Sequence, residues 1–300
     1  MNQRALLVGN DINNISHSYS WSNLIKGLKK YAKSDPEIDT DNNDKPFPLL
    51  YEEIYLSALN RYGTSESRIK SYIASQTRKL QPNEIHYSIL ELGIQNIFTT
   101  NYDLTFEIAA HLNKNECVNK GVIKESLYSV FRHHQTDRHK IWHIHGSETS
   151  PKTITLGYEH YSGYLQQMRS YVASGSKGIY KKKEFGSIKK RLLSNSINYD
   201  SWIDSFFTDD VFIIGLNLDF VELHLWWLLT YRARAKAEKR FPIDNNIVYF
   251  YPKKYEESSK YKLQMFKANG VDTIPVTLNG ENKLGYYNRV LDRIRNDYIR

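Results

Sequence analysis

Residues 5–11 read Ala-Leu-Leu-Val-Gly-Asn-Asp, an unbroken apolar run that small polar residues bring to an end. Two later stretches repeat this pattern, Ile-Phe-Thr-Thr-Asn at residues 97–101 and Ile-Ile-Gly-Leu-Asn at residues 213–217. Unbroken apolar runs are typical of strands that are buried on both faces of a parallel sheet. With two further apolar runs, the sequence predicts five strands, near residues 4–9, 95–100, 210–215, 246–251 and 272–276.

Helical patterns separate these strands. They are expected over about 21–31, 48–60, 65–78 and 83–92, from Leu104, through most of 158–206, over about 221–239, and from Tyr286. One region, residues 121–156, looks β-rich instead, with runs at 128–131, 141–145 and 153–156. Strands that alternate with helices predict an α/β fold with a doubly wound, mostly parallel sheet of Rossmann-like type.

The chain of 300 residues is expected to form a single domain. The predicted core takes residues 1–30, 93–157 and 207–300, and helical insertions at about 48–92 and 158–206 form a smaller lobe or flank the cleft. In such sheets, ligands bind outside the carboxyl ends of the strands. The polar residues that close the strands are therefore the candidates for a binding site.

Cysteine content and hydropathy limit the cellular compartments and the covalent or zinc cross-links that are expected for this chain. The only cysteine is Cys117, so neither an intrachain disulfide nor a Cys-based zinc site is expected. Residues 1–10 are too polar and too short for a signal peptide, and the longest apolar stretch, 223–230, is too short to span a membrane. These features favour a cytoplasmic protein that makes no membrane contact.

The formal net charge is +8, and basic residues cluster in two places. Solvated helix faces are one interpretation, and an anionic partner such as nucleic acid, an acidic protein surface or phosphates is the other. No zinc-finger or RNA-binding signature accompanies the charge, so nucleic acid is possible only as an indirect partner. The first cluster comprises Lys177, Lys181, Lys182, Lys183, Lys189, Lys190 and Arg191, and the second comprises Arg232, Arg234, Lys236, Lys239 and Arg240.

Two glycine loops are candidate phosphate or nucleotide contacts. Gly9 follows the first strand directly and would let the backbone approach a phosphate, with Asn10 and Asp11 beside it. The full GxGxxG fingerprint is absent, so an ordinary turn is an equal alternative. Gly215 and Asn217 follow the third strand in the same manner and could contact the adenosine half of a nucleotide.

The second strand ends in Thr100, Asn101 and Asp103. An amide both donates and accepts hydrogen bonds, so Asn101 could bind ribose hydroxyls or hold a water molecule. Asp103 could accept from a ribose hydroxyl or a carboxamide, and Thr100 stands between the strand and these side chains. The structural alternative is that Asp103 caps the following helix.

Two histidines lie in the stretch Ile-Trp-His-Ile-His-Gly at residues 141–146. Strand alternation would put His143 and His145 on one face, as in a metal site, but no carboxylate at metal spacing is nearby, so no metal is expected. His145 lies next to Gly146 at the strand end and is the better candidate for a general base.

These motifs together resemble the sirtuin family. The segment 98–103, FTTNYD, resembles the TxNxD segment of sirtuin-type NAD-binding domains, and 142–146, WHIHG, resembles their His-Gly element. The loops at Gly9 and Gly215 are similar to their first Gly-rich loop and late Gly-Ser/Asn loop. Order and spacing agree over about residues 4–280, and the combination looks most like the bacterial sirtuin-like NAD hydrolases of antiphage defence.

The sequence differs from that of sirtuin protein deacetylases at the motifs that deacetylation requires. Sirtuin deacetylases carry a four-Cys zinc ribbon, which a chain with Cys117 alone does not supply, and their first loop has a GAGxS pattern that is missing here. Thr100 also stands where they have Gln. The resemblance therefore implies cleavage of NAD at the nicotinamide–ribose bond rather than removal of acyl groups from lysine.

By this resemblance, Asn101 would position the ribose and the attacking water, Asp103 would hold the ribose or the carboxamide, and His145 would be the base. The resemblance also implies control by assembly as a homo-oligomer, or with a partner such as a HerA-like DNA-translocating ATPase. The many Tyr and Trp residues, including Trp226 and Trp227 on a late helix, could serve such an interface or the core. Alternative functions are a non-catalytic NAD or ADP-ribose sensor, a protein deacylase or ADP-ribosyltransferase, and a nucleic-acid-binding adaptor.

Overall fold

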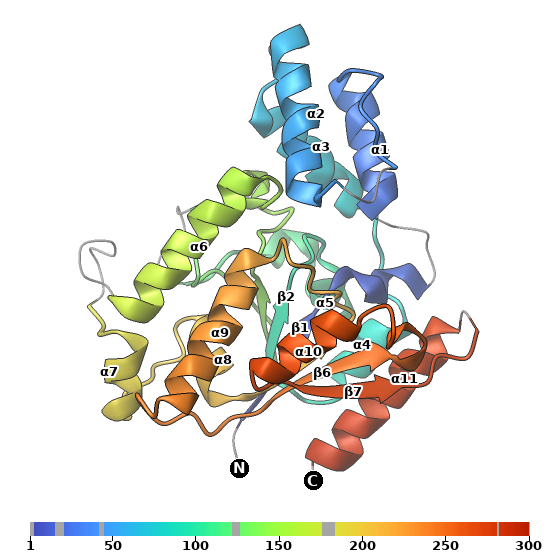
Figure 1. Cartoon of the computed structure of the whole chain (residues 1–300). Coiled ribbons are helices and arrows are strands. Elements are labelled where there is room, and N and C mark those ends of the chain that lie inside the picture. The colour runs from blue at the N-terminus through green and yellow to red at the C-terminus, as the bar shows by residue number, and fades with distance from the viewer. Residues whose placement is uncertain are drawn as a thin grey trace.

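The computed structural model describes residues 3–15, 21–41, 45–121, 127–175, 184–280 and 282–299. Its centre is one seven-stranded sheet with helices on both faces (Figure 1). Strand order is β3-β4-β2-β1-β5-β6-β7, and every neighbouring pair is parallel except β3 with β4. The five predicted strands are all present in this sheet, which confirms the α/β, mostly parallel fold.

The strand bounds agree closely with the apolar runs. They are β1 Arg4–Val8, β2 Asn96–Thr99, β3 His134–Gln135, β4 Lys140–His143, β5 Asp210–Ile214, β6 Ile247–Pro252 and β7 Asp272–Val276. β1 lies between β2 and β5. The chain therefore adds β2, β3 and β4 on one side of β1 and then adds β5, β6 and β7 on its other side. This is the switch point at which open α/β sheets bind ligands, outside the carboxyl ends of the strands.

One face of the sheet is covered by α6, α8, α9 and α10, whose bounds are Tyr158–Ala173, Trp202–Thr208, Leu223–Ala237 and Lys260–Ala268. Alternate strand residues such as Leu7 and Ile213 pack with the apolar sides of these helices in one buried cluster. The short α7, Ile188–Leu193, adds Ile188 to it. Trp226 and Trp227 of α9 pack against the same cluster and are only half-buried.

The opposite face is covered by α4 Glu84–Leu90, α5 Thr105–Ala109 and α11 Lys283–Arg293. Strand residues Leu6 and Phe212 point to this side and pack with Ile89 and Val290. Neighbours in each strand thus enter two different cores, which is why the strand sequences are apolar without interruption.

Three helices form a lobe of their own above the carboxyl edge of the sheet (Figure 1). They are α1 Trp21–Ala32, α2 Phe47–Tyr62 and α3 Glu66–Thr77. Leu28, Ile54 and Ile73 meet in a third buried cluster, which also holds Leu156. The division of the chain into a core and helical insertions stays a prediction. Helix α1, which begins in the predicted core, packs with the three-helix lobe, and helix α4, which lies in a predicted insertion, packs on the sheet.

The region 121–156 is less β-rich than its sequence predicts. Among its described residues, 128–131 form turns and 153–156 end a short 3-10 helix and continue as irregular chain, so both expected strands are wrong. Their apolar side chains are buried under helices: Val130 packs in the first cluster and Leu156 in the third. Apolar runs of four residues do not distinguish a strand from a buried loop.

The two basic clusters are not uniformly solvated. Arg191 is buried and pairs with Asp204 at 2.8 Å, and Arg232 is buried and donates to Asn245. Residues 177 and 181–183 of the first cluster lie outside the described residues. Over the part of the chain that the structure describes, no helix is long and apolar enough to cross a membrane.

Candidate functional site

The loops that follow β1 and β5 are joined backbone to backbone. The Gly9 N–H donates to the Ile214 carbonyl at 3.0 Å, and the Asp11 N–H donates to the Gly215 carbonyl at 3.1 Å. A Cβ on Gly9 would lie 2.4 Å from the Gly215 oxygen, and Gly215 itself has a φ of +63°. Both glycines are therefore required by the backbone geometry at this junction.

Asp11 fixes the first loop to α11. Its carboxylate lies 2.6 Å from the Lys283 ammonium and accepts a 2.7 Å hydrogen bond from the Tyr287 hydroxyl. Asn217 in the β5 loop accepts a hydrogen bond from Lys262 and donates to Asp219. These polar side chains hold the rims of the two loops in place.

Asn101 lies just beyond β2 and is buried. Its backbone is anchored: the N–H donates to Thr99 Oγ1 at 3.0 Å, and the carbonyl accepts from the His143 ring at 2.8 Å. Both polar atoms of its side chain, Oδ1 and Nδ2, are buried without a hydrogen-bond partner. A buried amide that forms no hydrogen bond costs free energy, so it indicates a partner supplied from outside the chain.

Asp103 ties the β2 loop to the first loop. Its Oδ2 accepts from Asn13 at 2.9 Å, and Asn13 also donates to Asn10 at 2.9 Å. Its Oδ1 accepts from the backbone N–H of Thr105 at 3.1 Å, at the start of α5. Asp103 thus supports the start of α5 from the residue before the N-cap, Leu104, and is not itself the N-cap that the structural alternative expected.

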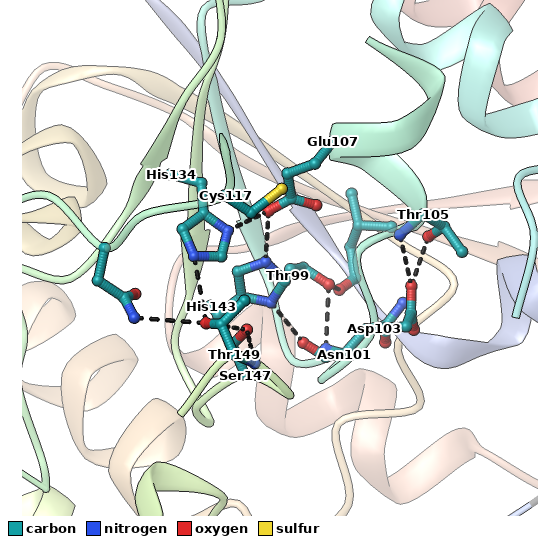
Figure 2. Close-up of polar contacts among 12 residues, drawn as sticks. Thr99, Asn101, Asp103, Thr105, Glu107, Cys117, His134, His143, Ser147 and Thr149 are labelled. Carbon is teal, nitrogen blue, oxygen red and sulfur yellow. Dashed lines mark hydrogen bonds and ion pairs between the residues drawn. The ribbon is translucent and has the colours of Figure 1, made fainter. Parts of the chain in front are cut away.

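Glu107, His134 and His143 form a buried relay beside Asn101 (Figure 2). Glu107 Oε1 lies 2.7 Å from His143 Nε2 and 2.5 Å from His134 Nδ1. Burial alone would raise the pKa of Glu107, but the charge and hydrogen bonds of His143 and His134 lower it to about 2. Burial likewise opposes protonation of His143, and the neighbouring Glu107 carboxylate nevertheless raises the pKa of this histidine. Both shifts favour the charged forms of Glu107 and His143, and His143 holds the Asn101 carbonyl by its other ring nitrogen.

A second cluster surrounds His145, which lies two residues beyond the end of β4. His145 Nε2 is 2.9 Å from His224 Nε2 and 3.3 Å from Glu222 Oε2. His224 Nε2 lies 3.9 Å from the same carboxylate oxygen. His143 and His145 therefore have separate partners and do not form the pair that strand alternation predicted.

Burial governs the protonation of this cluster. It lowers the pKa of His145 to about 3 and, together with His145, lowers that of His224 well below its usual value. Burial and the nearby Asp219 charge raise the pKa of Glu222 to about 8, and the neighbouring Tyr161 hydroxyl opposes this rise. At neutral pH both imidazoles are neutral, and a neutral imidazole can accept a proton or bind a cation.

Two adjoining cavities open at this edge of the sheet. The first, of about 310 Å³, is lined by side chains that include Thr100, His145, Tyr161 and Glu222. The second, of about 390 Å³, is lined by the aromatic residues Tyr249, Phe250, Tyr251, Tyr255, Tyr286 and Tyr287 among others. Asp11, Gly215, Leu216 and Asn217 line both cavities.

The structure brings most of the sequence-predicted site residues together. Those that line the first cavity are Asn10, Asp11, Thr100, His145, Gly215 and Asn217. Gly9, Asn101 and Asp103 do not line it; each is buried within three residues of a lining residue.

Sequence reasoning missed Glu222, His224 and Glu107. The expectation that the histidines have no carboxylate nearby was wrong, because Glu222 comes from the start of α9 and Glu107 from α5. Nothing in the local sequence pairs these residues with residues 143–145. The one available signal was the Glu-Leu-His stretch at residues 222–224, which opens a helix after a polar loop.

An open α/β sheet with polar loops and a cavity at its switch point is the architecture of nucleotide-binding domains. Residues 95–210 match the family model of the SIR2-like domain. This match covers the β2 loop and His145 and ends at the start of β5. It supports a sirtuin-like family and an NAD-related function. No curated protein matches the chain.

Proposed function

We propose that this protein is an NAD⁺ hydrolase that cleaves the nicotinamide–ribose bond and releases nicotinamide and ADP-ribose. The observation that carries the proposal is the Asn101 side chain, a buried amide with neither polar atom bonded. It adjoins Thr100, which lines a cavity together with His145. The match of residues 95–210 to the SIR2-like domain supports NAD as the substrate.

Cleavage of the nicotinamide–ribose bond needs no acid to protonate the leaving group. When the glycosidic bond breaks, its electron pair moves to the pyridinium nitrogen, and nicotinamide leaves as a neutral molecule. The ribose C1′ carries positive charge in the transition state, so the protein must orient the sugar and the incoming water. The unbonded amide of Asn101 is suited to both tasks, because it can accept from a ribose hydroxyl or water and donate to an oxygen.

His145 is the candidate base. As water adds to C1′, it must lose one proton, and the neutral imidazole at the cavity wall can take it. A general base contributes a rate factor of roughly 10² to 10⁴ and is most effective when its pKa lies near the working pH, so the lowered pKa of His145 places its contribution towards the lower end of that range. The Glu107–His143 relay would act indirectly, by keeping the Asn101 backbone in place.

The two adjoining cavities suit a substrate with two halves. The cavity beside His145 would take the nicotinamide ribose, and the cavity with six aromatic side chains would take the adenosine half. The pyrophosphate would pass the loop residues that the two cavities share, Asp11 and Gly215 to Asn217. Asp11, Asp103, Asn10 and Asn217 would hold the loops around it rather than react.

The test is turnover by purified full-length protein. Incubation with NAD⁺ and chromatography of the products should yield nicotinamide and ADP-ribose, whereas Asn101→Ala and His145→Asn should lose at least 100-fold in rate with unchanged circular dichroism. Asn60→Ala and His111→Asn, at exposed positions, are the matched controls. Binding of NAD⁺ without product would favour a sensor, and modified protein without free ADP-ribose would favour a transferase or deacylase.

The motif resemblance further supports a role in antiviral defence, in which loss of NAD⁺ stops the infected cell. Such an activity has to be held in check, so the proposal includes control by a homo-oligomer or by a partner such as a HerA-like ATPase. Light scattering with turnover measured at rising protein concentration tests this part. A monomer with full activity independent of concentration would contradict it, and phage plating on cells with Asn101→Ala tests the defence role.

A further inference from the structure

Three metal-ligating side chains from two distant segments converge at the wall of the first cavity. His145 comes from the turn after β4, and Glu222 and His224 come from the start of α9. Each offers one ligand atom, and the three atoms lie within 4.8 Å of one another. We propose that His145, Glu222 and His224 form a site for a transition-metal cation of the zinc class.

The spacing of the donor atoms fits a tetrahedral ion. The three separations among the two Nε2 atoms and Glu222 Oε2 are 2.9, 3.3 and 3.9 Å. A tetrahedral zinc ion with bonds of about 2.0–2.1 Å holds its donors about 3.3–3.4 Å apart. Shifts of roughly half an ångström in the donor atoms would bring all three separations to that value.

Glu222 Oε2 is buried and has no hydrogen-bond partner, so a ligand is the natural complement to it. The ring of His145 packs edge-on against Tyr161 with centroids 5.6 Å apart, and that of His224 packs edge-on against Tyr164 at 5.2 Å. Two aromatic contacts thus limit rotation of the rings, which is the preorganisation a metal site requires.

Two nitrogen donors and one carboxylate select the class of metal. Imidazole ligands suit zinc and its transition-metal neighbours, whereas magnesium and calcium prefer oxygen donors. Because His145 and Glu222 line the cavity, a fourth coordination position would face the open space. Three protein ligands with one open position are typical of a reactive or exchangeable zinc site.

The proton balance is simple. Two Nε2 atoms at 2.9 Å can share one proton, with one ring as donor and the other as acceptor. A cation that binds both atoms displaces that proton to the other nitrogen of its ring, so that both rings stay neutral. A protonated Glu222 carboxyl releases its proton to solvent when it binds the cation. No oxidant, reductant or further reactant is involved.

Among the residues that the structure describes, a second cluster of this kind, Glu107 with His134 and His143, does not carry the same inference. Glu107 Oε1 already accepts two short hydrogen bonds, at 2.5 and 2.7 Å, so this oxygen and the two ring nitrogens are paired with one another, although Glu107 Oε2 is buried without a partner. None of these residues lines either of the two cavities. It serves as an internal comparison for the experiment.

The experiment is calorimetric titration of chelator-treated full-length protein with Zn²⁺, repeated with Mg²⁺. One Zn²⁺ per chain should bind, and His224→Gln and Glu222→Gln should each weaken binding at least 100-fold. His111→Asn and Glu257→Gln, both exposed, are the matched controls. Unchanged Zn²⁺ binding in the two site variants, equal binding of Mg²⁺, or loss of binding in His134→Gln instead would overturn the proposal.

Because both site variants alter buried side chains, a second measurement uses the unaltered chain. Crystals soaked in Zn²⁺ should give an anomalous peak at the zinc edge within about 2.3 Å of His145, Glu222 and His224. Co²⁺ in solution should give the visible absorption of a tetrahedral site. A peak elsewhere, or none at these three residues, would overturn the proposal whatever the variants do. Neither measurement depends on NAD⁺ turnover.

Discussion

The His143 ring nitrogen Nδ1 lies 2.8 Å from the backbone carbonyl oxygen of Asn101. The other ring nitrogen lies 2.7 Å from Glu107, which also contacts His134 (Figure 2). Glu107 thus reaches the β2 loop through His143, and none of these three side chains is placed to touch a substrate in the first cavity. They are positioning residues for Asn101.

Glu107→Gln should therefore damage stability and turnover together. The neutral amide cannot balance the protonated His143, and breaking a buried ion pair costs about 3 kcal/mol. We expect a lower free energy of unfolding in urea and a fall in kcat with little change in KM. Glu91→Gln at an exposed position is the control. Equal kcat values for Glu107→Gln and the unaltered chain would contradict the positioning role.

The relay also predicts the response of stability to pH. The folded pKa of Glu107, about 2, lies below its ordinary value of 4.5, so its contribution is present above pH 4.5 and is lost as pH falls toward 2. The pKa of His143 is raised above 6.5, so its contribution is present below that value and is lost as pH rises through the raised pKa. Urea unfolding should find the largest gap between the unaltered chain and Glu107→Gln between about pH 4.5 and 6.5. A gap that stays constant down to pH 3 would contradict this.

Gly9→Ala tests the junction of the β1 and β5 loops. A Cβ there would lie 2.4 Å from the Gly215 carbonyl, and the backbone has to separate to admit it. We expect a loss of about 2–3 kcal/mol in stability, typical of overpacking, and weaker NAD⁺ binding. Gly93→Ala, at a positive φ with no atom within 4 Å of its Cβ, should cost only about 1 kcal/mol and leave binding unchanged. Similar binding affinities for the two variants would show that the junction does not shape the site.

Much of the fold was predictable because the strand signal is local. The runs near residues 5–8 and 211–214 are apolar at every position, and burial on both faces is the physical cause. The errors at 128–131 and 153–156 have the opposite cause. At these two places, helices from other parts of the chain bury short irregular segments. A run of four apolar residues shows that it will be buried, but it does not show whether a strand or a loop is the buried element.

The site was predictable only in part. Thr100, His145 and Gly215 follow from the rule that the carboxyl ends of parallel strands meet at one edge. The same rule does not predict the carboxylates that contact His143 and His145. Glu107 and Glu222 reach them through the packing of α5 and the start of α9, and such contacts depend on tertiary structure rather than on sequence spacing.

The final prediction joins the two proposals at His145. As a base this residue needs a free lone pair on one ring nitrogen. A zinc ion bound to Nε2 leaves the ring proton on Nδ1, so neither nitrogen keeps a free lone pair. Zn²⁺ should therefore inhibit NAD⁺ loss reversibly, with activity restored by a chelator, whereas Mg²⁺ should have no effect. The concentration of Zn²⁺ that halves the rate should match the dissociation constant from calorimetry. In a His224→Gln protein that keeps measurable turnover, inhibition should require at least 100-fold more Zn²⁺. Full turnover with the site saturated by Zn²⁺ would exclude His145 as the base and leave the metal site standing, and inhibition that is equal in the two proteins would place the inhibitory zinc elsewhere.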